Sequence, residues 1–267
     1  QQVLRAFADQ MALGLEAHRL RAASAAMATL NEANVLRTAL LQSVSHDLRT
    51  PLASIKASVT GLMADDAVFS PADRSSLLEA IDTSADRLDR VVGNLLDMSR
   101  LQAGATRPML APTALEEVVA AALTAISASH DLVRIDVSDS LPLVLTDAAL
   151  LERAVANVVS NALAWSPPDT PVRIDAALVR QSVTLRVVDR GPGIPASMRA
   201  NVFAPFQRLG DRSNDAGVGL GLAIAKGFVE TMGGTIEVDD TPGGGTTFTF
   251  TIPAVDTDDA PSLQESL

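Results

Sequence analysis

The sequence of 267 residues contains no cysteine and no tyrosine, and aromatic residues make up only 3% of it. The absence of cysteine excludes disulfide bonds, thiolate metal sites and a cysteine nucleophile. Because aromatic residues are few while 47% of the residues are hydrophobic, the composition predicts a core of aliphatic side chains. Lys and Arg number 21 against 32 Asp and Glu. The resulting net charge of −11 disfavours nucleic acid or an anionic membrane surface as the main partner.

Long apolar runs are also missing. No stretch approaches the ~20 apolar residues that a helix needs to cross a bilayer, and the first residues do not form a secretory signal. The sequence begins with Gln1 rather than Met, so we expect it to be a piece of a longer protein. Contact with a membrane is expected only through segments that this chain does not contain.

Helix-favouring residues dominate the first hundred positions. Apolar residues recur every seven positions from Leu41 to Leu62, and a second series with steps of four and three runs from Leu77 to Met98. Ser70 followed by Pro71 is typical of a helix start, and this second helix is expected to end near Gln102. The two helices predict an antiparallel hairpin. Since one hairpin cannot bury both apolar stripes, we expect two chains to form a four-helix bundle. The alternative is a solitary hairpin packed on its own C-terminal domain.

The periodicity changes after Gly104, where a linker or a first strand extends to Pro112. Helical patterns follow over residues 113–127, 147–165 and 219–232. Strand patterns cover residues 133–137, 172–178, 182–189, 235–239 and 246–252. We therefore expect an α+β sandwich with helices on one face of a mainly antiparallel sheet. Residues 255–267 contain four acidic and no basic residues, which predicts a disordered acidic tail.

His46 is the first candidate for chemistry. It lies about 160° around the predicted helix from the apolar stripe at Leu48, so its imidazole is expected to point to solvent. Asp47 is adjacent, and Thr50 lies one turn later on nearly the same face. A neutral imidazole is a competent nucleophile toward phosphorus, and a neighbouring carboxylate can stabilise the cation that forms. Taken alone, the residue could equally be a surface histidine without a role.

A glycine-rich segment follows the strand pattern at 182–189. Asp189 at the strand end can accept a hydrogen bond from an exocyclic amine, and Gly191 and Gly193 allow a flat ring to approach the backbone. A second segment precedes a predicted helix, where free backbone N–H groups bind phosphates; its glycines are Gly217, Gly219 and Gly221. Such glycine patterns also occur in ordinary turns. The second segment matches neither the phosphate loop nor a Rossmann unit.

Asn157 and Asn161 lie one turn apart on the helix predicted over 147–165, so both amides share one face. Amide oxygens suit a hard cation such as Mg²⁺, which takes water and phosphate oxygens as further ligands. The alternative is that both amides bond to neighbouring loops.

Together these segments resemble the sensor histidine kinases of two-component signalling over about residues 35 to 253. The motifs follow the family order: a histidine box at 45–52, an asparagine box at 157–161, a glycine box at 189–193, a phenylalanine box at 203–206 and a second glycine box at 217–221. Residues 36–41 look most similar to the potassium-responsive Kdp sensor branch. The resemblance implies a signal-transmitting helix over 1–35, a dimerisation and phosphotransfer hairpin over 36–104, and a Bergerat-type ATP-binding domain over 105–254.

The resemblance also implies roles for single residues. ATP would phosphorylate His46 with help from Asp47, and the phosphoryl group would pass to an aspartate of a response regulator. Thr50 would position the water that dephosphorylates this regulator. Asn161 would hold Mg²⁺ with Asn157 near the phosphates, Asp189 would bind the adenine amine, and the glycines at 217–221 would hold the phosphates beside a lid over 207–216. The family further implies a homodimer that forms the cytoplasmic part of a membrane-anchored bacterial sensor.

One position departs from the family pattern. Ala164 stands where the family often has a basic residue that contacts the phosphates, and Arg208 and Arg212 of the lid could supply the missing charge. If neither does, autophosphorylation should be slow while ATP binding survives. One alternative is a degenerate kinase that uses ATP as a conformational ligand or acts only as a regulator phosphatase. Another is an ATPase of the gyrase and chaperone type, which needs a carboxylate where this chain has Arg153 and Asn157.

Overall fold

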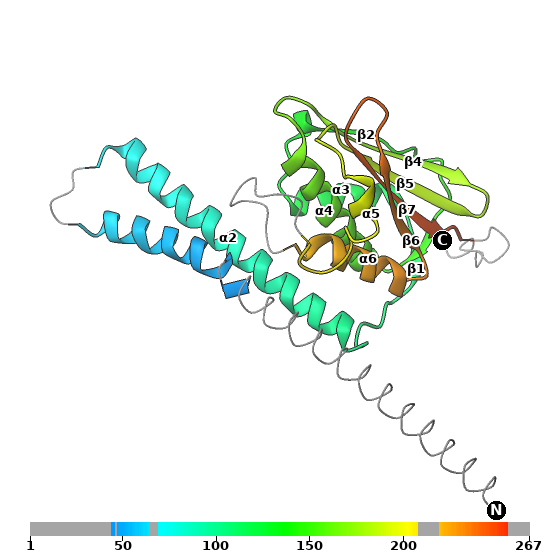
Figure 1. Ribbon diagram of the computed structural model, residues 1–267, viewed down its shortest axis with the longest axis horizontal. Helices are drawn as coiled ribbons and strands as arrows, with labels where there is room; N and C mark the ends of the chain where they lie inside the picture. Colours follow the sequence, from blue (N-terminus) through cyan, green and yellow to red (C-terminus); the bar gives the residue numbers. More distant parts are fainter. Residues whose placement is uncertain (1–43, 46, 65–68, 208–218, 256–267) are drawn as a thin grey trace, which may run out of the picture.

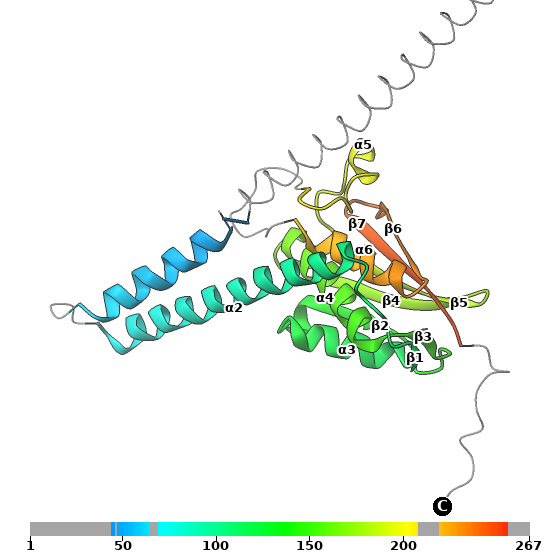
Figure 2. The same ribbon diagram turned by 90° about the horizontal axis from the view of Figure 1, so that it is seen from below.

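The computed structural model describes residues 44–45, 47–64, 69–207 and 219–255. Residues 44–45 and 47–62 are helical and run antiparallel to α2 (Pro71–Gln102) in a long hairpin (Figures 1 and 2). Ser70 starts α2 with a reciprocal cap, because its hydroxyl accepts from the N–H of Asp73 and the Asp73 carboxylate accepts from the N–H of Ser70. The predicted hairpin and its second helix are therefore confirmed.

The hairpin leaves part of its apolar surface open within the single chain. Leu52 and Val59, which form the second stripe of the first helix, are 58% and 38% exposed. Leu78 and Leu96 on α2 are exposed as well. The C-terminal part of α2 packs on the C-terminal domain, where Leu95, Met98 and Leu101 contact the hydrophobic core. The hairpin alone thus cannot cover both of its stripes.

The C-terminal domain is a two-layer sandwich (Figure 1). Its main sheet has the strand order β2-β4-β5-β7-β6, with β2 parallel to β4 and all other neighbours antiparallel. The strands are β2 (Val133–Asp136), β4 (Val172–Val179), β5 (Ser182–Val188), β6 (Thr235–Asp240) and β7 (Thr246–Pro253). The helices α3 (Leu115–Ala125), α4 (Ala148–Trp165) and α6 (Gly221–Thr231) cover one face. The predicted fold class is confirmed.

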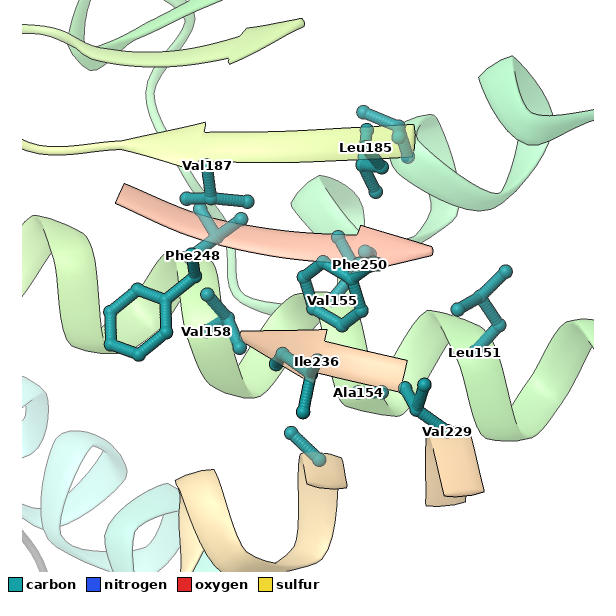
Figure 3. Close-up of a cluster of buried hydrophobic side chains, with 14 of the residues drawn as sticks. Leu151, Ala154, Val155, Val158, Leu185, Val187, Val229, Ile236, Phe248 and Phe250 are labelled. Carbon is teal, nitrogen blue, oxygen red and sulfur yellow. The ribbon is translucent and has the colours of Figure 1, made fainter. Parts of the chain in front are cut away.

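The core lies between α4, α6 and the inner face of the sheet. Successive residues of a strand point to opposite faces, so Leu185 and Val187 of β5 are buried while Arg186 between them points outward. The helix α4 packs Val155 and Val158 toward Phe248 and Phe250 of β7 (Figure 3). The core is aliphatic as predicted, except that three of the seven phenylalanines are among its largest fully buried side chains; these are Phe228, Phe248 and Phe250.

Several short elements differ from the sequence-based expectation. β3 (Val144–Thr146), a 3₁₀ turn (His130–Leu132) and α5 (Ala196–Arg199) were not predicted. β3 pairs antiparallel with β1 (Ala111–Thr113), so Thr113 belongs to a strand and not to the following helix. A strand of three residues is too short to show a recognisable alternation of apolar and polar residues. Its partner strand also lies elsewhere in the sequence, so the local pattern does not reveal the pairing.

Two predicted segments lie outside the described residues: the N-terminal helix over 1–35, and the acidic tail beyond Val255. None of the helices in the described part of the chain combines the length and apolarity of a membrane span.

Candidate functional site

Asp189 directly follows β5 and is 2% exposed. Its Oδ1 accepts hydrogen bonds from the backbone N–H groups of Gly191, at 2.8 Å, and Thr246, at 2.9 Å. Burial raises the pKa of Asp189 above its ordinary value, although these hydrogen bonds act in the opposite direction. The two N–H groups fix the orientation of the carboxylate, and both donate to Oδ1 rather than to Oδ2.

Glycines around Asp189 are required by close backbone packing. A Cβ on Gly191 would lie 2.7 Å from the carbonyl oxygen of Trp165, and one on Gly245 would lie 2.1 Å from that of Asp189. Gly245 also has a φ of +107°, which other residues rarely adopt. Because these positions are glycines, no side chain occupies the space beside the carboxylate, as binding of a flat ring requires.

The helix α4 joins this region to the start of α6. Asn157, Asn161 and Trp165 follow one another at intervals of four, so they share a face about 12 Å long. At one end of this face, a Cβ on Gly221 would lie 3.5 Å from Oδ1 of Asn157. At the other end, Trp165 contacts Gly191. The two asparagines, both half-buried, therefore lie between the Asp189 region and the N-terminus of α6.

Among the described residues no side chain caps the N-terminus of α6, and the first backbone N–H groups of a helix can bind an anion. Just before it, the N–H of Phe206 donates to the carbonyl oxygen of Gly219 at 2.8 Å. Gly219 has a φ of +73°, and a Cβ there would lie 2.8 Å from the carbonyl oxygen of Gln207. The described residues on the two sides of the predicted lid, Phe206 and Gly219, therefore lie side by side.

The predicted site residues Arg208, Arg212 and Gly217 lie outside the described part of the chain, and so does His46. On either side of His46 the chain is helical; Asp47 is buried, with 6% exposure, and Thr50 is exposed. Among the predicted nucleotide residues, those on α4, after β5 and before α6 come together in one region; they are Asn157, Asn161, Asp189, Gly191, Gly193, Gly219 and Gly221.

An ion pair between the hairpin and the C-terminal domain was missed from the sequence. Asp97 on α2 is 4% exposed, and its Oδ1 accepts from Nη1 of Arg153 at 2.8 Å, while Oδ2 contacts Nη2. Burial raises the pKa of Asp97, and the charge of Arg153 opposes this shift. The Arg153 guanidinium also lies 5.9 Å from the ring centre of Phe228. No local pattern predicts this pair, because its members are 56 residues apart.

The asparagine amides are too few to bind a metal ion by themselves, so a bound ligand would have to supply further oxygen atoms. The described residues contain no group of three or more His, Cys, Asp or Glu side chains that could hold a metal ion. Asn157 offers an amide oxygen beside the N-terminus of α6, and Asn161 lies one turn further along α4. Such a donor set fits Mg²⁺, which commonly takes most of its ligands from phosphate and water.

Comparison with known proteins agrees with this geometry. A model of the His Kinase A (phospho-acceptor) domain matches residues 36–104, and a model of the histidine kinase-, DNA gyrase B- and HSP90-like ATPases matches residues 146–256. The chain belongs to the histidine kinases. This histidine kinase is 47% identical to the sensor protein KdpD of Mycobacterium tuberculosis over 261 residues, which are 94% of this chain and 30% of that protein.

Two further relatives agree. KdpD of Escherichia coli is 34% identical over 267 residues, which are 99% of this chain and 29% of that protein. The histidine kinase chain thus spans less than a third of the length of these two KdpD proteins. The crystal structure of full-length ShkA in complex with AMPPNP is 27% identical, has a TM-score of 0.56, and covers 81% of this chain and 46% of its own.

Proposed function

We propose that this histidine kinase core transfers the γ-phosphoryl group of ATP to His46 and then passes it to an aspartate of a response regulator. The observation that carries the proposal is Asp189, a buried carboxylate oriented by two backbone N–H groups. It lies at the adenine end of a region whose other end is an uncapped helix N-terminus. The AMPPNP complex of ShkA supports ATP as the nucleotide.

The described residues divide the binding of ATP between two ends of the site. Asp189 accepts from the exocyclic amine of adenine, and Gly191 and Gly193 leave room for the ring. The phosphates bind at Gly219, Gly221 and the first N–H groups of α6, together with Gly217. Asn161 holds Mg²⁺ with Asn157 nearby, and the cation neutralises phosphate charge when it is bound.

The reaction is an in-line displacement at the γ-phosphorus. A nitrogen of neutral His46 forms a bond to phosphorus while the bond to the ADP oxygen breaks, and Asp47 stabilises the imidazolium that results. Rate enhancement comes mainly from positioning and from neutralisation of charge. Arg208 and Arg212 supply the positive charge that a basic residue at position 164 often supplies in the family.

The two reacting groups belong to different parts of the chain. We assign residues 1–35 to signal transmission, 36–104 to dimerisation and phosphotransfer, 105–254 to ATP binding, and 255–267 to an acidic tail. The exposed apolar side chains of the hairpin support pairing with a second copy as a homodimer. Movement about the linker at 104–112 brings ATP to His46, and Thr50 orients the water that dephosphorylates the regulator.

The test is incubation with γ-labelled ATP and Mg²⁺ of the unchanged chain and His46→Gln. The other two histidines provide matched controls, His18→Gln and His130→Gln. We expect acid-labile, alkali-stable label on the unchanged chain and on both controls, and none on His46→Gln. ATP binding without label on any variant would instead establish a module that uses ATP as a conformational ligand, as Ala164 would favour.

A further inference from the structure

The outer face of the main sheet carries a basic cavity. The helices cover the opposite face, so this side is open (Figures 1 and 2). The cavity has a volume of about 480 Å³, and none of its lining residues is acidic. Guanidinium groups come from β2, from β4, from β5 and from the residue two positions after β5; they are Arg134, Arg173, Arg186 and Arg190.

The strand register places like charges side by side. Arg134 lies directly opposite Arg173 in the parallel pair of β2 and β4. Like charges in such positions destabilise a sheet, so pairing of the strands does not explain this arrangement. Within the described residues Arg134 forms no ion pair, which leaves its charge uncompensated. A basic group of this kind stands out in a chain with a net charge of −11.

The other three arginines form contacts with neighbouring groups. Asp175, which is 8% exposed, contacts Nη2 of Arg173 at 3.0 Å and Nη2 of Arg186 at 2.6 Å. Nη1 of Arg190 donates to the carbonyl oxygen of Pro242 at 2.6 Å. One carboxylate therefore holds two guanidinium groups.

The cavity is distinct from the nucleotide site. Consecutive residues after β5 point to opposite sides, so Asp189 is buried while Arg190 is exposed. The same alternation occurs at the start of β7. Thr246 is buried and its backbone N–H donates to Asp189, whereas Thr247 faces the outer cavity. The sheet itself thus separates the two sites.

We propose that this cavity binds a small organic molecule that carries two or more phosphate groups. Planar guanidinium groups bind phosphate oxygens in pairs. The arginines come from the three neighbouring strands β2, β4 and β5 and from the segment after β5, so the cavity offers four guanidinium groups, more than one phosphate would occupy in pairs. The volume is that of a small-molecule site, and Pro171, Val188 and Pro242 provide apolar surface for a carbon skeleton.

The test is calorimetric titration of the full chain with inositol hexakisphosphate in the absence of Mg²⁺. The variant is Arg134→Gln, because this arginine supports no other group in the described residues. The matched control is Arg180→Gln in the turn between β4 and β5, which belongs to the same sheet but lies outside the cavity. We expect Arg134→Gln to weaken binding about tenfold or more, and Arg180→Gln to leave it within about twofold.

Two further measurements distinguish loss of this binding site from unfolding and from binding at the nucleotide site. The melting temperature of Arg134→Gln should not fall, because the substitution removes a like-charge contact. Asp189→Asn should weaken ATP binding and leave binding of inositol hexakisphosphate intact, so the proposal stands or falls apart from the kinase assignment. Absence of binding, or equal losses in Arg134→Gln and Arg180→Gln, would overturn it. Tighter binding of poly-glutamate with the same dependence on Arg134 would overturn it in favour of an acidic protein partner.

Discussion

Replacement of Arg153 by glutamine should weaken the contact between the C-terminal domain and α2. The carboxylate of Asp97 is 4% exposed, and Arg153 is the cation that contacts both of its oxygens. Without Arg153 the docked state would retain a buried charge that has lost its partner. The undocked state escapes this cost because water reaches Asp97 there.

The magnitude follows from the burial of the two partners. Exposed ion pairs contribute about 0–1 kcal/mol, whereas breaking a fully buried pair costs about 3–5 kcal/mol. Asp97 is buried, but the side chain of Arg153 is 45% exposed, so the pair lies between these limits. We expect a loss of about 2 kcal/mol, which lowers the ratio of docked to undocked chains about 30-fold.

Single-molecule energy transfer can measure this ratio. The chain contains no cysteine, so Asp82→Cys on α2 and Asp239→Cys on β6, both exposed, accept dyes without competition. The matched control is Arg90→Gln, an exposed arginine on α2. Equal populations in Arg153→Gln and Arg90→Gln would refute the reasoning.

The same assay tests the direction in which the docked population changes with pH. Burial raises the pKa of Asp97 in the docked state above its ordinary value of 3.8. The docked state therefore binds the proton more tightly, so docking is strongest at low pH and weakens as pH rises through the raised pKa. Loss of Arg153 raises the pKa of Asp97 further, so the docked population of Arg153→Gln should recover on acidification. Asp97→Asn should abolish this recovery.

Four other predictions concern the nucleotide site and the hairpin. Asp189→Asn should lower ATP affinity about 10- to 100-fold in calorimetry, because its carbonyl can still accept from the two backbone N–H groups and the amide nitrogen then meets the adenine amine. In the unchanged chain, ATP affinity should fall as pH drops through the raised pKa of Asp189, since the protonated carboxyl is a poorer acceptor. Gly245→Ala should reduce the free energy of unfolding by about 1–3 kcal/mol more than Gly244→Ala, measured by urea denaturation. Both glycines have a positive φ, but only at Gly245 does a Cβ meet a backbone atom, so similar losses would contradict the importance of this close packing. Thr50→Ala should slow dephosphorylation of the regulator while label on His46 persists, and a parallel loss of both would argue against a separate role.

The sequence by itself determined the features that depend on neighbouring residues. Ser70 and Asp73 cap α2 within a single turn, and Asp147 caps α4 through the N–H groups of Ala149 and Leu150. Alternation within β4 and β5 predicts which side chains are buried. The order of the motifs was sufficient to identify the family, because each motif lies within a few consecutive residues.

Only the tertiary structure decided which distant groups meet. Asp97 and Arg153 are 56 residues apart, and Asp189 and Thr246 are 57 apart. The pairing of β1 with β3 and the position of Arg134 opposite Arg173 also depend on strand register. Periodicity reports the face on which a residue lies, but not the residue that faces it. Packing of the whole chain sets which distant residues contact each other. These contacts form the interface between α2 and the C-terminal domain, and they form the basic cavity.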